Sequence, residues 1–128
     1  MKILLDTNIL VWAAQDILPK KAYDIINNKN NVLIFSTISI YEVVLKRGKD
    51  PANFIIDPIL FYNNLRNCEY EELNVTGRHA LLVSVLPFIH KDPFDRLIVA
   101  QAISEGLPLL TSDKILTEYH NSIIYTGR

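Results

Sequence analysis

Four acidic residues stand where their carboxylates could act together. Asp6 and Asp113 each follow an apolar run that predicts a strand, Glu42 lies one to two turns into the helix after another such run, and Asp95 opens a later helix. In open parallel sheets, ligands bind beyond the carboxyl ends of the strands, so we expect these four side chains to meet at one edge of a sheet. Such a cluster repels itself unless cations or protons are held there.

Clustered carboxylates suit hard divalent cations. Mg²⁺ typically keeps several waters and uses one or two carboxylates together with phosphate oxygens of a substrate. Two such ions can activate the attacking water and neutralise the leaving oxygen of a phosphodiester. Histidine and cysteine show no zinc-like spacing, and His79 and His90 are each isolated, so we expect surface or supporting roles for them. The four acids therefore predict metal-dependent hydrolysis of a phosphodiester.

Helix capping is a simpler explanation for each acid taken alone. Asp and Ser at strand-to-helix turns are preferred N-caps, and Ser39 with Glu42 has the spacing of a capping box. Asp95 and Asp113 also stand where the positive end of a helix dipole favours negative charge. Taken singly, capping is the better interpretation, whereas the convergence of acids from separate segments favours a shared site.

Polar neighbours could support the acids without touching a metal. Thr7 and Asn8 can donate hydrogen bonds from the first turn of a helix, although plain capping explains them equally well. Ser112 can orient Asp113. These residues are therefore candidates for support of the site.

The segment around Asp95 combines a constrained turn with a basic residue. Pro93 holds the preceding Asp92 extended and shapes the approach to Asp95, which we expect to open the next helix. Arg96 either pairs with Asp92 or contacts a phosphate, and we prefer the ion pair. Three aromatic residues with apolar neighbours are expected in the core rather than as stacking platforms for bases, namely Trp12, Phe88 and Phe94.

Apolar runs and helical spacing predict the elements that position these residues. Short apolar runs predict buried strands at residues 2–5, 32–35 and 107–110. Helical spacing, with proline or glycine near the ends, predicts helices at residues 9–14, 20–28, 40–47, 59–66, 79–86 and 96–105. Residues 70–75 and 122–125 are candidates for further strands. Strands that alternate with helices predict an α/β domain around a parallel sheet.

Length and composition indicate a folded cytoplasmic protein. The chain of 128 residues has the usual size of one domain, so we expect residues 1–128 to form one. With 49% hydrophobic and 21% charged residues it is neither a disordered tail nor a fibre. Its apolar stretches are far shorter than the roughly 20 residues of a membrane span, and Asp6 interrupts any export signal. The lone Cys68 fits a reducing cytoplasm.

The formal net charge of −1 is low for a protein that binds a polyanion. If metal neutralised four carboxylates, the rest of the chain would be positive, with basic groups at residues 20–21, 46–49 and 78–79. Solvated helix faces explain these basic groups equally well, so charge alone neither supports nor excludes a nucleic acid.

The segments around the acids resemble the motifs of PIN-domain proteins, and more narrowly those of VapC-type toxins of type II toxin-antitoxin systems. LDTN at residues 5–8, followed by VW at 11–12, and SIYE at 39–42 resemble the first two acidic motifs. HKDPFDR continuing into LIVAQA at residues 90–102 resembles the third, and LTSD at 110–113 the fourth. The first motif alone is weak, whereas the third is long and specific, and the resemblance runs nearly end to end.

The resemblance implies a three-layer α/β/α fold with a twisted, mainly parallel sheet of about five strands. It implies an endoribonuclease that cleaves RNA with Mg²⁺ or Mn²⁺, a homodimer, and a small antitoxin partner that occludes the site. Asp92 would be an accessory to the metal site, and Asn8 and Ser112 would give polar support. The implied metal ligands are Asp6, Glu42, Asp95 and Asp113.

Two other functions remain as alternatives. Asp6 could be a nucleophile that accepts a phosphoryl group. However, phosphohydrolases of the haloacid dehalogenase type carry a second Asp two residues later, where this chain has Asn8. The chain could instead be a non-catalytic binding module whose acidic groove holds a basic segment of a partner. Cleavage of RNA that depends on divalent cations separates the binding module from the nuclease.

Overall fold

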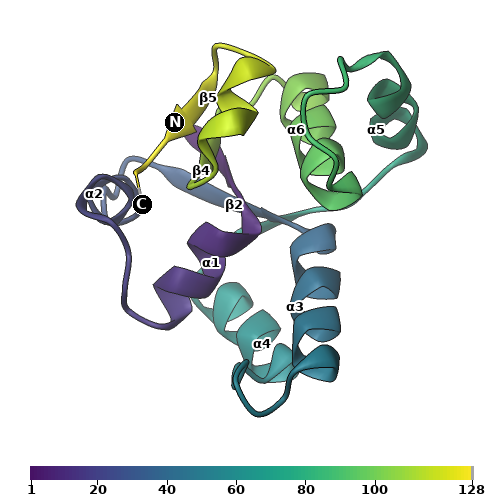
Figure 1. The fold of residues 1–128 in the computed structure, drawn as a ribbon. Coiled ribbons are helices and arrows are strands. Elements are labelled where there is room, and N and C mark those ends of the chain that lie inside the picture. The colour runs from purple at the N-terminus through teal and green to yellow at the C-terminus, as the bar shows by residue number, and fades with distance from the viewer. Residues whose placement is uncertain (128) are drawn as a thin grey trace.

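The fold is built on one parallel sheet, described from a computed structural model in which residues 1–127 are placed. The order of the strands across the sheet is β3-β2-β1-β4-β5, and each neighbouring pair is parallel. Figure 1 shows the sheet with helices around it. The strands are β1 (Lys2–Leu5), β2 (Val32–Ser36), β3 (Glu71–Leu73), β4 (Leu109–Thr111) and β5 (Ile123–Tyr125).

Helices connect successive strands, as parallel pairing requires. The α-helices are α1 (Thr7–Ala14), α2 (Lys20–Ile26), α3 (Thr37–Lys49), α4 (Pro58–Asn67), α5 (Gly77–Leu82) and α6 (Pro93–Glu105). Two short 3-10 helices complete the chain, η1 (Val83–Val85) and η2 (Lys114–Glu118). Within residues 1–127, no helix combines the length and the apolar character that crossing a membrane requires.

Alternate residues of the central strand β1 enter two different cores. Ile3 and Leu5 pack with apolar residues of α1, α2 and α4, whereas Leu4 packs with residues of α6. All three side chains are fully buried, and burial of each contributes roughly 1.5–3 kcal/mol. In Figure 1, α5 and α6 lie on the opposite side of the sheet from α1 and α4. The α/β/α fold with a parallel sheet of five strands, expected from the sequence, is confirmed.

The strand order creates a topological switch at the centre of the sheet. From β1 the chain continues to β2 and β3 on one side, and later to β4 and β5 on the other. A crevice forms beyond the carboxyl ends of strands at such a switch, and it is the usual ligand site of open α/β sheets. Asp6 follows β1 directly, and Asp113 follows β4 after one intervening residue. The fold therefore brings these two acids to the same crevice.

Most expected elements are present, with ends that local capping shifts. The helix expected at residues 40–47 begins earlier, at Thr37, because the Ser36 side chain accepts a hydrogen bond from the Ile38 N–H. The strand expected at 107–110 is shifted to β4, because Gly106 ends α6 in the left-handed conformation with φ 66°. The helix expected at 79–86 is the shorter α5 followed by η1. The two further candidate strands are confirmed as β3 and β5.

Candidate active site

Asp6 is held rigidly at the end of the central strand. Its N–H donates to the Leu110 carbonyl at 2.9 Å, which continues the pairing of β1 with β4. One carboxylate oxygen accepts from the Thr7 N–H at 2.8 Å, and the other accepts from the Thr111 hydroxyl at 2.7 Å. The side chain is buried, with 4% of its surface exposed. Asp6 thus caps α1 and also belongs to the crevice.

Glu42 reaches the same crevice from α3 through a hydroxyl of α1. The Thr7 hydroxyl donates to Glu42 Oε1 at 2.6 Å and lies 2.8 Å from the Ser39 hydroxyl. Because the one Thr7 proton goes to Glu42, the Ser39 hydroxyl is the donor in the second contact. Ser39 and Glu42 lie inside α3 and face α1, so their interpretation as a capping box is wrong, and Ser36 is the cap.

Asp95 lies in the first turn of α6, whose cap is Asp92. The Asp92 carboxylate accepts from the Phe94 N–H at 2.8 Å and the Asp95 N–H at 3.3 Å, and Pro93 occupies the first helical position. The expectation that Asp95 opens the helix is therefore wrong by three residues. Asp92 serves as the cap instead of forming the expected ion pair with Arg96.

Asp113 is fixed at both oxygens. One oxygen accepts from the Ile115 N–H at 3.2 Å, and the other lies 2.9 Å from His90 Nε2. The same histidine nitrogen is 3.4 Å from the Asp95 carboxylate. Its Nδ1 accepts from the Asp92 N–H at 3.0 Å. His90 therefore lies between Asp113 and Asp95, a place that its isolation in the sequence did not reveal.

The electrostatics show that the acids are close enough to act on one another. Burial and, after it, the negative charges of Asp6, Asp92, Glu42 and Asp113 together raise the pKa of Asp95 to about 8. Burial likewise raises the pKa of Asp6, opposed by the hydrogen bond from Thr111. Burial also raises the pKa of Glu42, opposed by the hydrogen bond from Thr7. The sheet edge thus concentrates negative charge that protons or cations must balance.

The donor set at this edge fits a divalent cation. Atoms of His90, Asp95 and Asp113 that could meet a cation lie within 4.8 Å of one another, and two of the three are anionic carboxylates; no other such group is found within residues 1–127. Carboxylate oxygens are the preferred ligands of Mg²⁺ and also suit Mn²⁺. Asp6, at the end of β1, and Glu42, in α3, act electrostatically on Asp95, so they add negative charge to the same space. The residues present are therefore suited to hold such an ion.

One hydroxyl and one amide complete the surroundings of the acids. The Thr111 hydroxyl accepts from the Asp113 N–H at 3.0 Å while it donates to Asp6, a role that the sequence pattern does not predict. The pairing of Leu5 with Leu110 places Thr111 beside Asp6, so the contact between these two residues follows from the register of β1 with β4. Asn8 is exposed and accepts from Lys46 Nζ at 3.4 Å, which places an amine at the rim of the crevice.

Arg96 is buried and braces the segment that precedes α6. Its guanidinium donates to the carbonyls of Pro87 and Val83, at 3.0 and 3.2 Å, and to the Tyr119 hydroxyl at 3.2 Å. The guanidinium carbon also lies 4.9 Å from the centre of the Phe88 ring. Phe88 is 76% exposed, so its expected place in the core is wrong. Arg96 is therefore a structural residue that holds the backbone before α6, and it does not face a phosphate.

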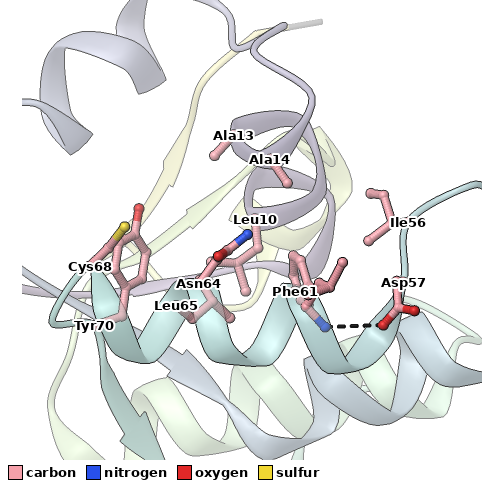
Figure 2. Close-up of a pocket in the computed structure, with 11 residues that line it drawn as sticks. Leu10, Ala13, Ala14, Ile56, Asp57, Phe61, Asn64, Leu65, Cys68 and Tyr70 are labelled. Carbon is pink, nitrogen blue, oxygen red and sulfur yellow. Dashed lines mark hydrogen bonds between the residues drawn. The ribbon is translucent and has the colours of Figure 1, made fainter.

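A separate pocket lies between α1 and α4 and has a different character. Figure 2 shows Leu10 of α1 facing Phe61 and Leu65 of α4. The cavity has a volume of about 270 Å³, and Asp57 is the only acidic residue among those that line it. This mainly apolar pocket has no cluster of carboxylates that could hold a cation against the negative charge of a phosphodiester. The acidic crevice is therefore the better candidate for chemistry.

Comparisons with known proteins agree with this fold. Among the solved structures, a chain of VapBC2 from Rickettsia felis, bound to a DNA fragment from its promoter, matches with a TM-score of 0.71 and 21% identity over 99% of this chain and 98% of that one. A toxin-antitoxin complex from Klebsiella pneumoniae matches with a TM-score of 0.69 and 18% identity over 98% of both chains.

VapC20 of Mycobacterium tuberculosis, described as a toxin that cleaves the sarcin-ricin loop, matches with a TM-score of 0.66 and 14% identity over 98% of this chain and 99% of that one. At such identities these likenesses concern the fold. No protein with a curated function matches the sequence. The sequence profile of the PIN domain matches residues 3–121, which include all four acids. The chain therefore belongs to the PIN-domain family.

Proposed function

We propose that this protein is an endoribonuclease that hydrolyses RNA with Mg²⁺ or Mn²⁺ held by the four acids. The observation that carries the proposal is their convergence: Asp6, Glu42, Asp95 and Asp113 come from four segments of the chain and influence one another at one sheet edge. Capping explains why Asp6 and Asp113 lie at this edge, but Glu42 lies inside α3 and Asp95 follows the cap of α6, so capping does not explain these two. Membership of the PIN-domain family supports a nuclease.

The residues of the chain divide the work of such a site. The four carboxylates would hold the cation, and Asp92 would add negative charge while it caps α6. Thr111 and Thr7 would keep Asp6 and Glu42 in place through their hydroxyl donors. When bound, a divalent cation supplies a Lewis acid and a more acidic water. Lys46, at the rim, is placed to meet the phosphate of a substrate.

RNA as the substrate and an antitoxin as the partner are the finer parts of the proposal. A structural neighbour described as a sarcin-ricin loop cleaving toxin supports RNA. Neighbours that are complexes of toxin and antitoxin support a small protein partner, and we include the expected homodimer and cytoplasmic location in the proposal. A basic segment of the partner would bind the negative crevice, so the affinity of the pair should fall with added salt and on Asp6→Asn.

The phosphoryl-transfer alternative conflicts with the surroundings of Asp6. Both of its carboxylate oxygens accept hydrogen bonds, and only 4% of the residue is exposed. Each oxygen keeps a further lone pair that can meet a cation, but a nucleophile must also move to the phosphorus, and the hydrogen bonds to buried groups hold this carboxylate at the end of β1. A covalent aspartyl phosphate after incubation with a small phosphomonoester would revive this alternative.

Cleavage of total cellular RNA tests the proposed function. The purified protein is incubated with Mg²⁺, with Mn²⁺ or with chelator, and the cut ends are mapped. We expect cleavage only with added cation and a rate at least about a hundredfold lower for Asp95→Asn, the scale of losing one electrostatic catalytic group. Asp24→Asn is the matched control, because Asp24 is an exposed acid on α2 that pairs with Lys20. Undiminished cleavage in chelator, or none with any cation, would contradict the proposal.

A further inference from the structure

One histidine touches the acidic crevice and is not explained by the role of the acids alone. His90 lies in the segment before α6, is about one fifth exposed at 22%, and approaches two of the acids. Its backbone N–H donates to the Tyr119 hydroxyl at 2.8 Å, and Arg96 donates to the same hydroxyl. The position of His90 is therefore fixed by the buried framework and not by chance packing at the surface.

Hydrogen bonding decides which nitrogen of this imidazole carries the proton. The Asp92 N–H donates to Nδ1 at 3.0 Å, so Nδ1 must be the unprotonated nitrogen of the ring. The proton then resides on Nε2, where it is donated to Asp113 Oδ2 at 2.9 Å. A nitrogen that carries a proton has no lone pair for a cation. The geometry therefore makes His90 a hydrogen-bond donor toward the carboxylates and not a metal ligand.

We propose that His90 is a positioning residue that holds Asp113, and beside it Asp95, in the arrangement that binds a divalent cation. Asp113 lies at the start of η2, and 36% of its side chain is exposed. With only the hydrogen bond from the Ile115 N–H, its carboxylate could rotate. The Nε2–H of His90 removes that freedom and leaves the other lone pairs of both oxygens for the cation. This inference rests on the proposed function, since it assumes a cation at the acids.

Two substitutions test the roles of the two His90 nitrogens one at a time. In His90→Asn, the side-chain oxygen takes the place of Nδ1 and accepts the Asp92 N–H as in a common turn, but the donor to Asp113 is lost. In His90→Gln, the longer side chain brings an N–H donor to the place of Nε2 and gives up the Nδ1 contact. His120 provides the matched control, because its Nδ1 accepts from the Ser122 N–H at 3.1 Å in an equivalent turn.

The measurement is Mn²⁺ binding by titration calorimetry, accompanied by thermal melts in chelator. We expect His90→Asn to weaken the Mn²⁺ affinity by roughly tenfold or more, the usual effect of losing a partner of a metal ligand, with a melting temperature in chelator close to that of the wild type. His90→Gln should keep the affinity within roughly threefold of the wild type. The corresponding substitutions of His120 should leave the affinity unchanged.

Several outcomes would overturn the inference. Equal Mn²⁺ affinity for the wild type and His90→Asn would do so, as would equal losses in the Asn and Gln variants. A nitrogen coordinated directly to Mn²⁺ in pulsed electron paramagnetic resonance, lost on substitution of His90, would make the histidine a ligand and refute a positioning role. If the wild type binds Mn²⁺ but cuts no RNA, the nuclease proposal fails. The Mn²⁺ affinities of the wild type, His90→Asn and His90→Gln then still decide the role of His90. A wild type that binds no Mn²⁺ refutes both.

Discussion

Removal of the Asp95 carboxylate should stabilise the protein when no cation is present. The pKa of Asp95 is about 8 in the folded protein against 3.8 for the ordinary side chain. At pH 7, about three pH units above the ordinary pKa of 3.8, the folded protein keeps this carboxyl protonated. Keeping the proton there costs roughly 4 kcal/mol. Water reaches the side chain, which is 18% exposed, and screens its neighbours, so we expect about half of that cost. Asp95→Asn should therefore raise the free energy of unfolding by about 2 kcal/mol, or the melting temperature by about 6 °C.

The pH dependence of this gain has a definite sign. Because the pKa of Asp95 is raised by folding, the folded wild type binds more protons than the unfolded chain between pH 3.8 and about 8. Its stability therefore falls as the pH rises through that window. Asn carries no such proton, so the advantage of Asp95→Asn should be absent near pH 3.5, grow with pH, and level off above pH 8.

Urea denaturation in chelator at several pH values measures this difference. Asp57→Asn is the matched control, since Asp57 is an exposed acid that caps α4 and is not among the charges that act on Asp95, and Asn caps a helix about as well. Its effect should be small and nearly independent of pH. Saturating Mg²⁺ should reverse the order of wild type and Asp95→Asn, since a ligand at a hundredfold excess over its Kd stabilises by about 2.7 kcal/mol. A pH-independent effect of Asp95→Asn, or a loss of stability in chelator, would refute the reasoning.

Three further substitutions test the structure around the crevice. Thr111→Val removes both the donor to Asp6 and the acceptor for the Asp113 N–H, so urea denaturation should show a loss of about 2 kcal/mol, and no loss would contradict these bonds. Arg96→Lys cannot reach two carbonyls and a hydroxyl at once, so the melting temperature should fall by several degrees, about 2 kcal/mol in stability, and an unchanged value would argue against the bracing role. Gly106→Ala meets open space but must keep φ at 66°, so calorimetry should show a loss of about 1 kcal/mol, and a stabilised variant would contradict the left-handed cap.

The fold followed from the sequence because its signals are local. The run at residues 3–5 is apolar at every position, which is typical of a strand buried on both faces, and Pro58 and Gly106 mark helix ends by their backbone preferences. The start of α3 was missed because Ser36 and Ser39 are both plausible caps. Only tertiary contact decides between them: the hydrogen bond of Ser39 to Thr7 places it inside the helix.

The candidate site was predictable only as far as strand ends can be recognised. Asp6 and Asp113 follow apolar runs, and a parallel sheet necessarily brings such positions to one edge. The role of Thr111 depends on the register of β1 with β4, which no local pattern encodes. The place of His90 depends on the path of the segment before α6, which the buried Arg96 fixes through long-range hydrogen bonds.

The most direct test of the central claim is a count of the divalent ions that the acids bind. Titration calorimetry with Mn²⁺ should detect saturable binding of one or two ions by the wild type. Asp6→Asn and Asp113→Asn, which keep the shape of the side chain and remove its charge, should each weaken that binding by at least roughly tenfold, or about 1.4 kcal/mol. Asp24→Asn, at an exposed acid on α2, should bind as the wild type does. Equal Mn²⁺ binding by all four proteins, or none by the wild type, would contradict the claim that these carboxylates form a metal site.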